Sequence, residues 1–269
     1  VLRGAWNAMR RPPDGTRPGL YTLPCGFGEI GHRAAQLLDA RLGARVTALA
    51  VTTSGVEVAW TGREGMKSLS ADRLVVATEA GPAAKLLASC APSAAEVLAG
   101  FTYAPVTLVH WVDDPPGASK LPDGFGYLAS PRENRFALGT LFVGDLLDAT
   151  PRRFATFVGG ALQPGGARLP DDALVDGITS DLKHLTGGHV GRLVAVVRWP
   201  EAVFQPAPGH LERVASLRSA LAGTPIALAG SYLGGAAMKD ALVSGFAAAE
   251  RLVPVAAGSS LPRVPEARA

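Results

Sequence analysis

IALAGSYLGGAAMKDALVSGFAAAERL, the stretch from Ile226 to Leu252, decides the fold expected for this chain. A short apolar run ends at Gly230, a loop containing Gly234 and Gly235 follows, and a helical pattern rich in small residues then begins. Glycines let the backbone approach a ligand closely, and a helix that starts after such a loop presents free amide groups. The pattern predicts a buried strand, a ligand-contacting loop and a helix. A tight connection whose small residues serve packing alone is the alternative.

A second apolar run leads into a helix in the same way. Residues 72–78 read DRLVVAT and end in the small residues Ala77 and Thr78, before a helix expected over residues 82–89. Continuous apolar runs are typical of strands that are buried on both faces of a parallel sheet. Residues 74–77 and 226–229 therefore predict a parallel, nucleotide-binding sheet whose other strands must come from elsewhere.

The remaining segments predict antiparallel strands and further helices, so the fold class is α+β (α/β). Short strands expected at 46–51, 56–60 and 69–76 form a meander, with a Thr-Thr-Ser-Gly turn between the first two. An antiparallel sheet is expected from residues 127–130, 135–142 and 155–159, and further strands from residues 106–112 and 193–199. Helices are expected from residues 1–9, 30–42, 94–98, 171–185, 210–221 and 240–252.

Composition excludes several classes of protein. The 269 residues are 48% hydrophobic and 18% charged, which is the balance of a globular soluble protein. The net charge is +3, but Lys and Arg are scattered, so no nucleic-acid partner is expected. Cys25 and Cys90 form no CxxC motif, which argues against a metal site and a disulfide framework and favours the cytoplasm. Apolar runs are too short to span a bilayer, whereas peripheral membrane contact stays open.

The 226–252 stretch resembles the C-terminal motif of the protoporphyrinogen/coproporphyrinogen oxidase family, within the flavin-containing amine oxidase superfamily. Ser231, Lys239 and Ala241 depart from the family pattern, as does the Ala236-Ala237 pair. Tyr103-Ala-Pro-Val106, Leu138-Gly-Thr-Leu-Phe142 and Gly209-His210 are similar to further family blocks, in the family's order. The matching positions of the motif are Gly230, Tyr232, Gly235, Asp240, Ser244 and Gly245.

The resemblance implies part of a FAD/NAD(P)-binding Rossmann-like domain together with an antiparallel substrate-binding sheet. Residues 1–100 are expected to be a partial FAD-binding region with the meander, and residues 101–200 the substrate-binding region. Residues 201–255 would close the FAD site, and residues 256–269 would form a flexible tail. We expect a C-terminal portion that lacks the family's N-terminal GxGxxG segment. GFGEIG at residues 26–31 fits that motif literally, but only a short strand precedes it, so we interpret the match as false.

The resemblance also implies FAD as the cofactor and a porphyrinogen as the substrate. Arg132 and Arg135 are candidates to bind the substrate carboxylates. Trp199 could stack near the flavin or be an ordinary core residue. No catalytic side chain is assigned, because the cofactor carries the chemistry. The implied FAD-binding residues are Val46, Ala77, Thr78, Trp199, Gly230, Ser231, Ala236, Ala237 and Met238.

The expected function is FAD-dependent oxidation of a porphyrinogen to a porphyrin in haem biosynthesis, with oxygen as the acceptor. We expect this chain alone to be incomplete and to need a missing N-terminal segment or a partner chain. The alternative is a non-catalytic fragment, a split subunit or a degenerate interaction module of the same fold. Another member of the wider amine oxidase or desaturase superfamily is a third possibility.

Overall fold

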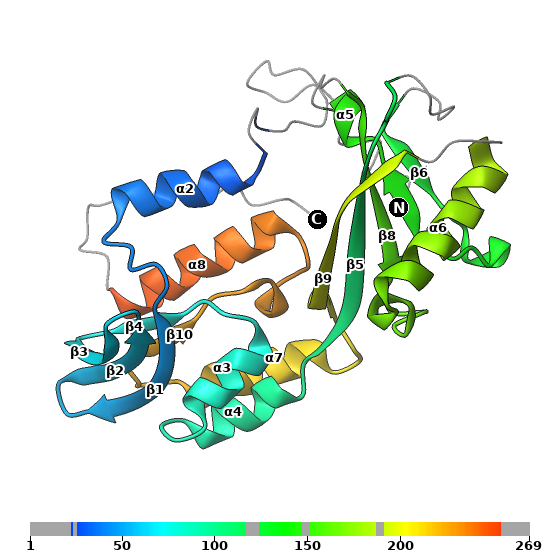
Figure 1. Cartoon of the computed structure of the whole chain (residues 1–269). Helices are drawn as coiled ribbons and strands as arrows, with labels where there is room; N and C mark the ends of the chain where they lie inside the picture. Colours follow the sequence, from blue (N-terminus) through cyan, green and yellow to red (C-terminus); the bar gives the residue numbers. More distant parts are fainter. Residues whose placement is uncertain (1–22, 24–25, 117–123, 147–150, 187–190, 254–269) are drawn as a thin grey trace, which may run out of the picture.

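The computed structural model describes residues 23, 26–116, 124–146, 151–186 and 191–253 (Figure 1). Within these residues the strands form three separate sheets, and helices pack around them, which confirms the expected α+β class. The helix expected over residues 1–9 and the tail at 256–269 lie outside the described residues.

The smallest sheet is the predicted parallel pair. β4 (Leu74–Val76) and β10 (Ile226–Leu228) run parallel, with Leu74 opposite Ile226. All of β10 is buried, as expected. Val75 in β4 is 40% exposed, so burial on both faces was only partly right for this strand. Among the described residues β4 has no neighbour on its other edge, which explains the exposure.

Helices cover both faces of β10. Ile226 and Leu228 belong to a core that includes residues of α3 (Ala80–Leu87), α4 (Pro92–Ala99) and α7 (His210–Ala220). Ala227 and Ala229 instead pack against α8 (Met238–Leu252). Side chains on a strand alternate between its two faces, so large residues meet one layer of helices and alanines meet the other. Figure 1 shows α8 on one side of the parallel pair, and α3, α4 and α7 on the other.

The meander consists of β1 (Arg45–Thr52), β2 (Gly55–Gly62) and β3 (Gly65–Ala71). The turn that joins β1 to β2 is the predicted one. The strand expected over residues 69–76 is wrong as a single element, because the chain leaves the meander after Ala71 and joins the parallel sheet at Leu74. Helix α2 (Gly28–Leu37) ends five residues earlier than the expected position 42, where Leu38 turns extended, and it has no buried residue.

The antiparallel sheet has the strand order β6-β7-β8-β5-β9. Its β9 continues to Gln205, six residues beyond the strand expected to end at Trp199, and residues 203–205 pair with the first residues of β5. Only residues 139–141 of the expected strand 135–142 are extended. The strands are β5 (Thr102–Val112), β6 (Gly126–Leu128), β7 (Gly139–Leu141), β8 (Arg153–Gly159) and β9 (Arg192–Gln205).

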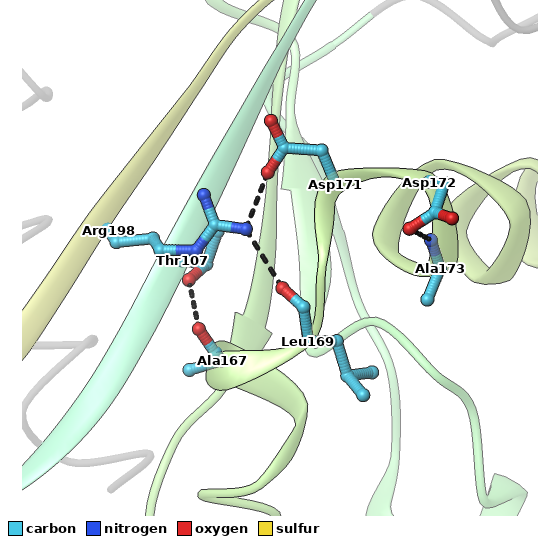
Figure 2. A network of polar contacts seen from close by, with 7 residues as sticks. All are labelled: Thr107, Ala167, Leu169, Asp171, Asp172, Ala173 and Arg198. Atoms are coloured by element: carbon cyan, nitrogen blue, oxygen red, sulfur yellow. Dashed lines mark hydrogen bonds and ion pairs between the residues drawn. The ribbon is translucent and has the colours of Figure 1, made fainter.

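Helix α6 (Asp171–Thr186) covers one face of this sheet. Leu174, Ile178 and Leu182 of α6 are buried against Trp111 of β5 and Phe154 of β8. Figure 2 shows the polar contacts at the start of the helix. The Thr107 hydroxyl donates to the Ala167 carbonyl (2.7 Å), and the Arg198 guanidinium donates to the Leu169 carbonyl (2.8 Å) and to Asp171 (2.5 Å) (Figure 2).

The opposite face of the sheet is only partly buried among the described residues: Val106 and Ala155 on this side are buried, whereas other side chains are exposed. Thr107 and Arg198 are paired across β5 and β9 and both point toward the α6 side, so the residues next to them in sequence point away from it. These residues are apolar, and Trp199 is 54% exposed. We call this side the uncovered face; its residues include Leu108, Leu141, Phe157, Val197 and Trp199.

The Ser244 side chain connects the carboxyl end of β10 to α8 by hydrogen bonds, and replacing it should destabilise the fold. Its hydroxyl accepts the Gly230 amide hydrogen (2.8 Å) and donates to the Ala241 carbonyl (2.6 Å). We expect Ser244→Ala to lower the free energy of unfolding by about 1–2 kcal/mol, because a half-buried amide loses its acceptor. Urea denaturation measures the change. Ser216→Ala, at an exposed position of α7, is the control, and equal effects of both substitutions would contradict this role.

Candidate cofactor site

Two hollows meet where β4 and β10 end. The first, of about 560 Å³, lies between the start of β1 and the β4–α3 segment, and Val46, Ala77 and Thr78 line it. The second, of about 220 Å³, is lined by Ala77 and Thr78 again and by Gly230 and Ser231. In open sheets with parallel strands, ligands bind outside the carboxyl ends of the strands. The structure therefore brings five of the predicted cofactor residues together at such an edge.

The first hollow combines an apolar lining with a cationic rim. Leu49, Val58 and Leu74 contribute side chains, and Arg45 and Lys85 also line it. Val46 lies beside a β-bulge, where the pairing of β1 with β2 shifts between Val46 and Ala48. A bulge interrupts the ladder and re-aims the neighbouring residues. This hollow suits a flat apolar group that is attached to phosphate.

Carboxylate and tyrosine side chains line the second hollow. Glu79 and Glu201 both line it, and the Tyr103 hydroxyl accepts the Ala80 amide hydrogen at the start of α3 (3.1 Å). Burial raises the pKa of the Tyr103 phenol, the hydrogen bond from Ala80 opposes this change, and the carboxylates of Glu201 and Glu79 add to the increase. A neutral phenol between two carboxylates favours N–H and O–H donors over phosphate.

Tyr232 lines the second hollow, and its hydroxyl is buried without a partner among the described residues. Its side chain is 1% exposed, and within the described part of the chain the hydroxyl makes no hydrogen bond. Burial raises the pKa of Tyr232 well above its usual value, and Tyr103 and Glu79 raise it further. A buried hydroxyl without a partner costs free energy, so such a group calls for an explanation. The hydroxyl is enclosed by the protein and does not reach the open space of the second hollow.

Gly230 is required by this geometry. A Cβ atom at position 230 would lie 2.4 Å from Cε1 of Tyr232, so any other residue would displace the ring. The loop then continues through the short helix η3 (Ser231–Leu233) to Gly235, where a Cβ would lie 2.4 Å from Oδ2 of Asp240. Gly230 therefore has a packing role as well as a position in the second hollow, whereas Gly235 has a packing role only, so packing and ligand contact are compatible explanations for Gly230.

The other predicted cofactor residues lie apart from the two hollows. Ala236 and Ala237 precede α8, Met238 begins it, and the Ala237 amide donates to the Asp240 carboxylate (3.2 Å). None of the three residues lines either hollow in the described part of the chain. Trp199 lies on the uncovered face, and its exposure shows that the core alternative for this residue is wrong.

The two candidate substrate arginines lie between β6 and β7. Arg132 is exposed in the short helix η1 (Pro131–Glu133). Arg135 is half-buried, and its Nε has no hydrogen-bond partner among the described residues. Neither arginine lines either hollow. Their role toward a substrate stays a prediction.

Sequence reasoning missed four polar residues of the second hollow: Tyr103, Tyr232, Glu79 and Glu201. Tyr232 and Glu79 could have been found, because each lies within two positions of a predicted site residue. Glu201 carried no such signal, since its place depends on the extension of β9 beyond Trp199.

Comparison with known proteins assigns the class. Residues 9–253 match the family described as flavin containing amine oxidoreductase. This match covers most of the sequence, so the chain belongs to the flavin-containing amine oxidoreductase family. A flavin cofactor is thus characteristic of the class to which this chain belongs.

Individual relatives point to one branch of that family. The chain is 27% identical over 262 residues to protoporphyrinogen oxidase 1 of spinach chloroplasts (Spinacia oleracea), and 30% identical over 242 residues to coproporphyrinogen III oxidase of Propionibacterium freudenreichii. These alignments cover 88% and 85% of the chain but only 44% of each relative, so the chain spans less than half of their length.

A solved structure shares the fold. The crystal structure of a protein from Exiguobacterium sp. 255-15, provisionally assigned as a protoporphyrinogen oxidase, superposes with a TM-score of 0.69 at 19% identity. The superposition covers 83% of this chain and 50% of that one. Among the residues that our structure describes, no helix is both long enough and apolar enough to cross a membrane.

The buried phenol of Tyr232 leads to a prediction about alkaline stability. Because its pKa is raised in the folded protein, this phenol stabilises the fold below its ordinary pKa of about 10, and the contribution is lost as the pH rises further. We expect the stability of the unchanged chain to fall more steeply above about pH 10 than that of Tyr232→Phe. Urea denaturation across this range measures it. Parallel pH profiles would contradict the assignment.

Proposed function

We propose that this chain provides the second half of a FAD site and the substrate sheet of an enzyme that oxidises porphyrinogens to porphyrins with oxygen. One observation carries the proposal: Ala77 and Thr78 form a shared floor of two hollows at the carboxyl ends of parallel strands. The named activities of the spinach and Propionibacterium relatives support the choice of substrate. Haem biosynthesis is the pathway that such an activity would serve.

The charges of the two hollows suggest how FAD lies. Arg45 and Lys85 make the first hollow suited to the adenosine and phosphate end, whereas Glu79 and Glu201 would repel phosphate from the second. The second hollow therefore suits the uncharged N–H and O–H groups at the flavin end of the molecule, which the Glu79 and Glu201 carboxylates can accept. Val46, Ala77, Thr78, Gly230 and Ser231 would hold FAD, which would supply the two-electron acceptor for a hydride from a substrate carbon, with oxygen as the final acceptor.

The uncovered face is our candidate for the substrate surface. A porphyrinogen is a large ring with apolar faces and carboxylate side chains, and Trp199 and Val197 present an apolar surface to such a ring. We propose that Arg132 and Arg135, in the β6–β7 connection of the same sheet, bind the carboxylates. The chain's task is then to orient the ring and exclude water, without a side-chain nucleophile.

Cofactor binding can be tested on the chain itself. We expect FAD to bind saturably, measured by quenching of flavin fluorescence. Lys85→Ala should weaken FAD binding by about two- to fivefold and leave riboflavin binding unchanged, because riboflavin has no phosphate. Lys67→Ala, an exposed lysine of the meander, is the matched control. A folded chain that binds no FAD would overturn the prediction that this half of the site binds FAD by itself.

Substrate binding can be tested with the stable porphyrin products. We expect coproporphyrin III or protoporphyrin IX to bind with a shift of the porphyrin absorption band, and the tighter ligand would indicate the substrate. Trp199→Leu should weaken this binding by about tenfold, because it removes a stacking ring. Leu211→Ala, at an exposed position of α7, is the control. If Trp199→Leu has no effect, the uncovered face is not the substrate surface.

A second candidate function is a non-catalytic subunit or fragment that assembles with another polypeptide. One observation favours it: β10 has an unpaired edge among the described residues. The two candidates differ in the flavin titration, because an assembly module of this fold need not bind FAD.

A further inference from the structure

Strand β9 bulges where it passes from the antiparallel sheet to the second hollow. Trp199 and Val203 pair with residues of β5 that are only two positions apart, so residues 200–202 lie opposite the single residue Pro105. Proline has no amide hydrogen for a ladder bond, and extra residues at a bulge re-aim the side chains that they carry. Glu201, the middle residue of the bulge, lines the second hollow.

The Glu201 carboxylate has no hydrogen bond or ion pair within the described part of the chain. Its Oε1 atom lies 3.1 Å from the position that a Cβ atom of Gly81 would occupy, so the carboxylate lies against the first turn of α3. The first turn of a helix is the end that favours negative charge. The side chain is also exposed, so a proton that it takes up can pass on to water.

No positive side chain compensates this carboxylate, since no Lys, Arg or His lines the second hollow among the described residues. The other titratable groups in its lining are the Glu79 carboxylate at the start of α3 and the phenols of Tyr103 and Tyr232, from β5 and η3. Burial raises the pKa of both phenols, so both are neutral near pH 7. Two carboxylates without a counter-charge favour a positive charge that develops beside them.

Oxidation of a porphyrinogen produces such a charge. When a bridge carbon gives a hydride to FAD, its C–H bond breaks, and the ring keeps a positive charge that the adjacent pyrrole nitrogen shares. The N–H bond of that pyrrole then breaks, its electron pair forms a C=N double bond, and its proton needs an acceptor. A carboxylate beside the ring stabilises the cation and can take up this proton.

We propose that Glu201 accepts this pyrrole proton and stabilises the cationic ring before the proton leaves. The inference rests on the proposed function and adds a catalytic residue to it. Trp199 precedes Glu201 by two residues in the same strand, at most about 7 Å away along it, so a ring that stacks on Trp199 extends to the carboxylate. Glu79 instead directly follows Thr78 after β4, and so lies on the cofactor side of the hollow.

The test follows the protonation of coproporphyrin III bound to the whole chain without FAD. The imine nitrogens of this porphyrin take up protons with a change in its absorption spectrum, so a pH titration gives the protonation constant. A carboxylate beside the ring favours the protonated form. We expect Glu201→Gln to lower the protonation constant of the bound porphyrin about tenfold. Glu201→Asp keeps the charge and should restore most of this loss.

Two further variants separate the position of Glu201 from acidity in general. Glu79→Gln removes the other carboxylate of the hollow and should change the protonation constant less than about threefold, because this residue lies on the cofactor side. Glu57→Gln, at an exposed position of β2, should change it less than about twofold, because solvent and salt screen distant charges.

The outcomes also separate this inference from the proposed function. Equal effects of Glu201→Gln and Glu79→Gln would overturn the inference, as would a bound porphyrin that does not respond to Glu201→Gln, and either result would leave porphyrin binding in place. A folded chain that binds no porphyrin would overturn both the inference and the proposed substrate. The flavin titration is independent of these readouts, because FAD is absent from the porphyrin measurements.

Discussion

The parallel pairing of Leu74 with Ile226 is the interaction on which the rest of the structure depends. Parallel strands share one carboxyl edge, so this single register brings Ala77 and Gly230 together although most of the chain separates them in sequence. The two strands lie between two layers of helices that contact side chains of different size. Large side chains of β10 pack toward α3, α4 and α7, and alanines let α8 approach the other face closely.

The sequence predicted local elements well where the residues that define them are adjacent. The apolar run at 226–229, the glycines after it and the small-residue helix that follows all appear in the structure. The division between β3 and β4 was not predicted, because Leu69 and Leu74 lie only five residues apart in the expected strand 69–76 but pair with strands of different sheets. The extension of β9 was missed for the same reason, since it depends on pairing with the distant start of β5.

The same difference between local and distant contacts decides which residues of the candidate site could be predicted. Ala77, Thr78, Gly230 and Ser231 were predicted and do meet, because each directly follows one of the two paired strands. The predicted residues 236–238 lie outside the hollows, because the loop bends there and Asp240 holds the Ala237 amide. Spacing alone does not reveal the direction in which a glycine-rich loop turns. Glu201 could not be predicted as a site residue, because it lies in β9 of the antiparallel sheet, far in sequence from the two paired strands.

The start of β5 and the end of β9 lie side by side, with Thr102 opposite Gln205. The antiparallel sheet therefore leaves the chain that builds the parallel pair, and returns to it, at a single junction. The part of the sheet beyond Tyr103 and Glu201 could be exchanged for one of another size or surface, while the Leu74–Ile226 register and the hollows beside it keep their form. Substrate range and cofactor binding can thus diverge separately in such proteins, as long as the two paired strand ends that carry Tyr103 and Glu201 are kept.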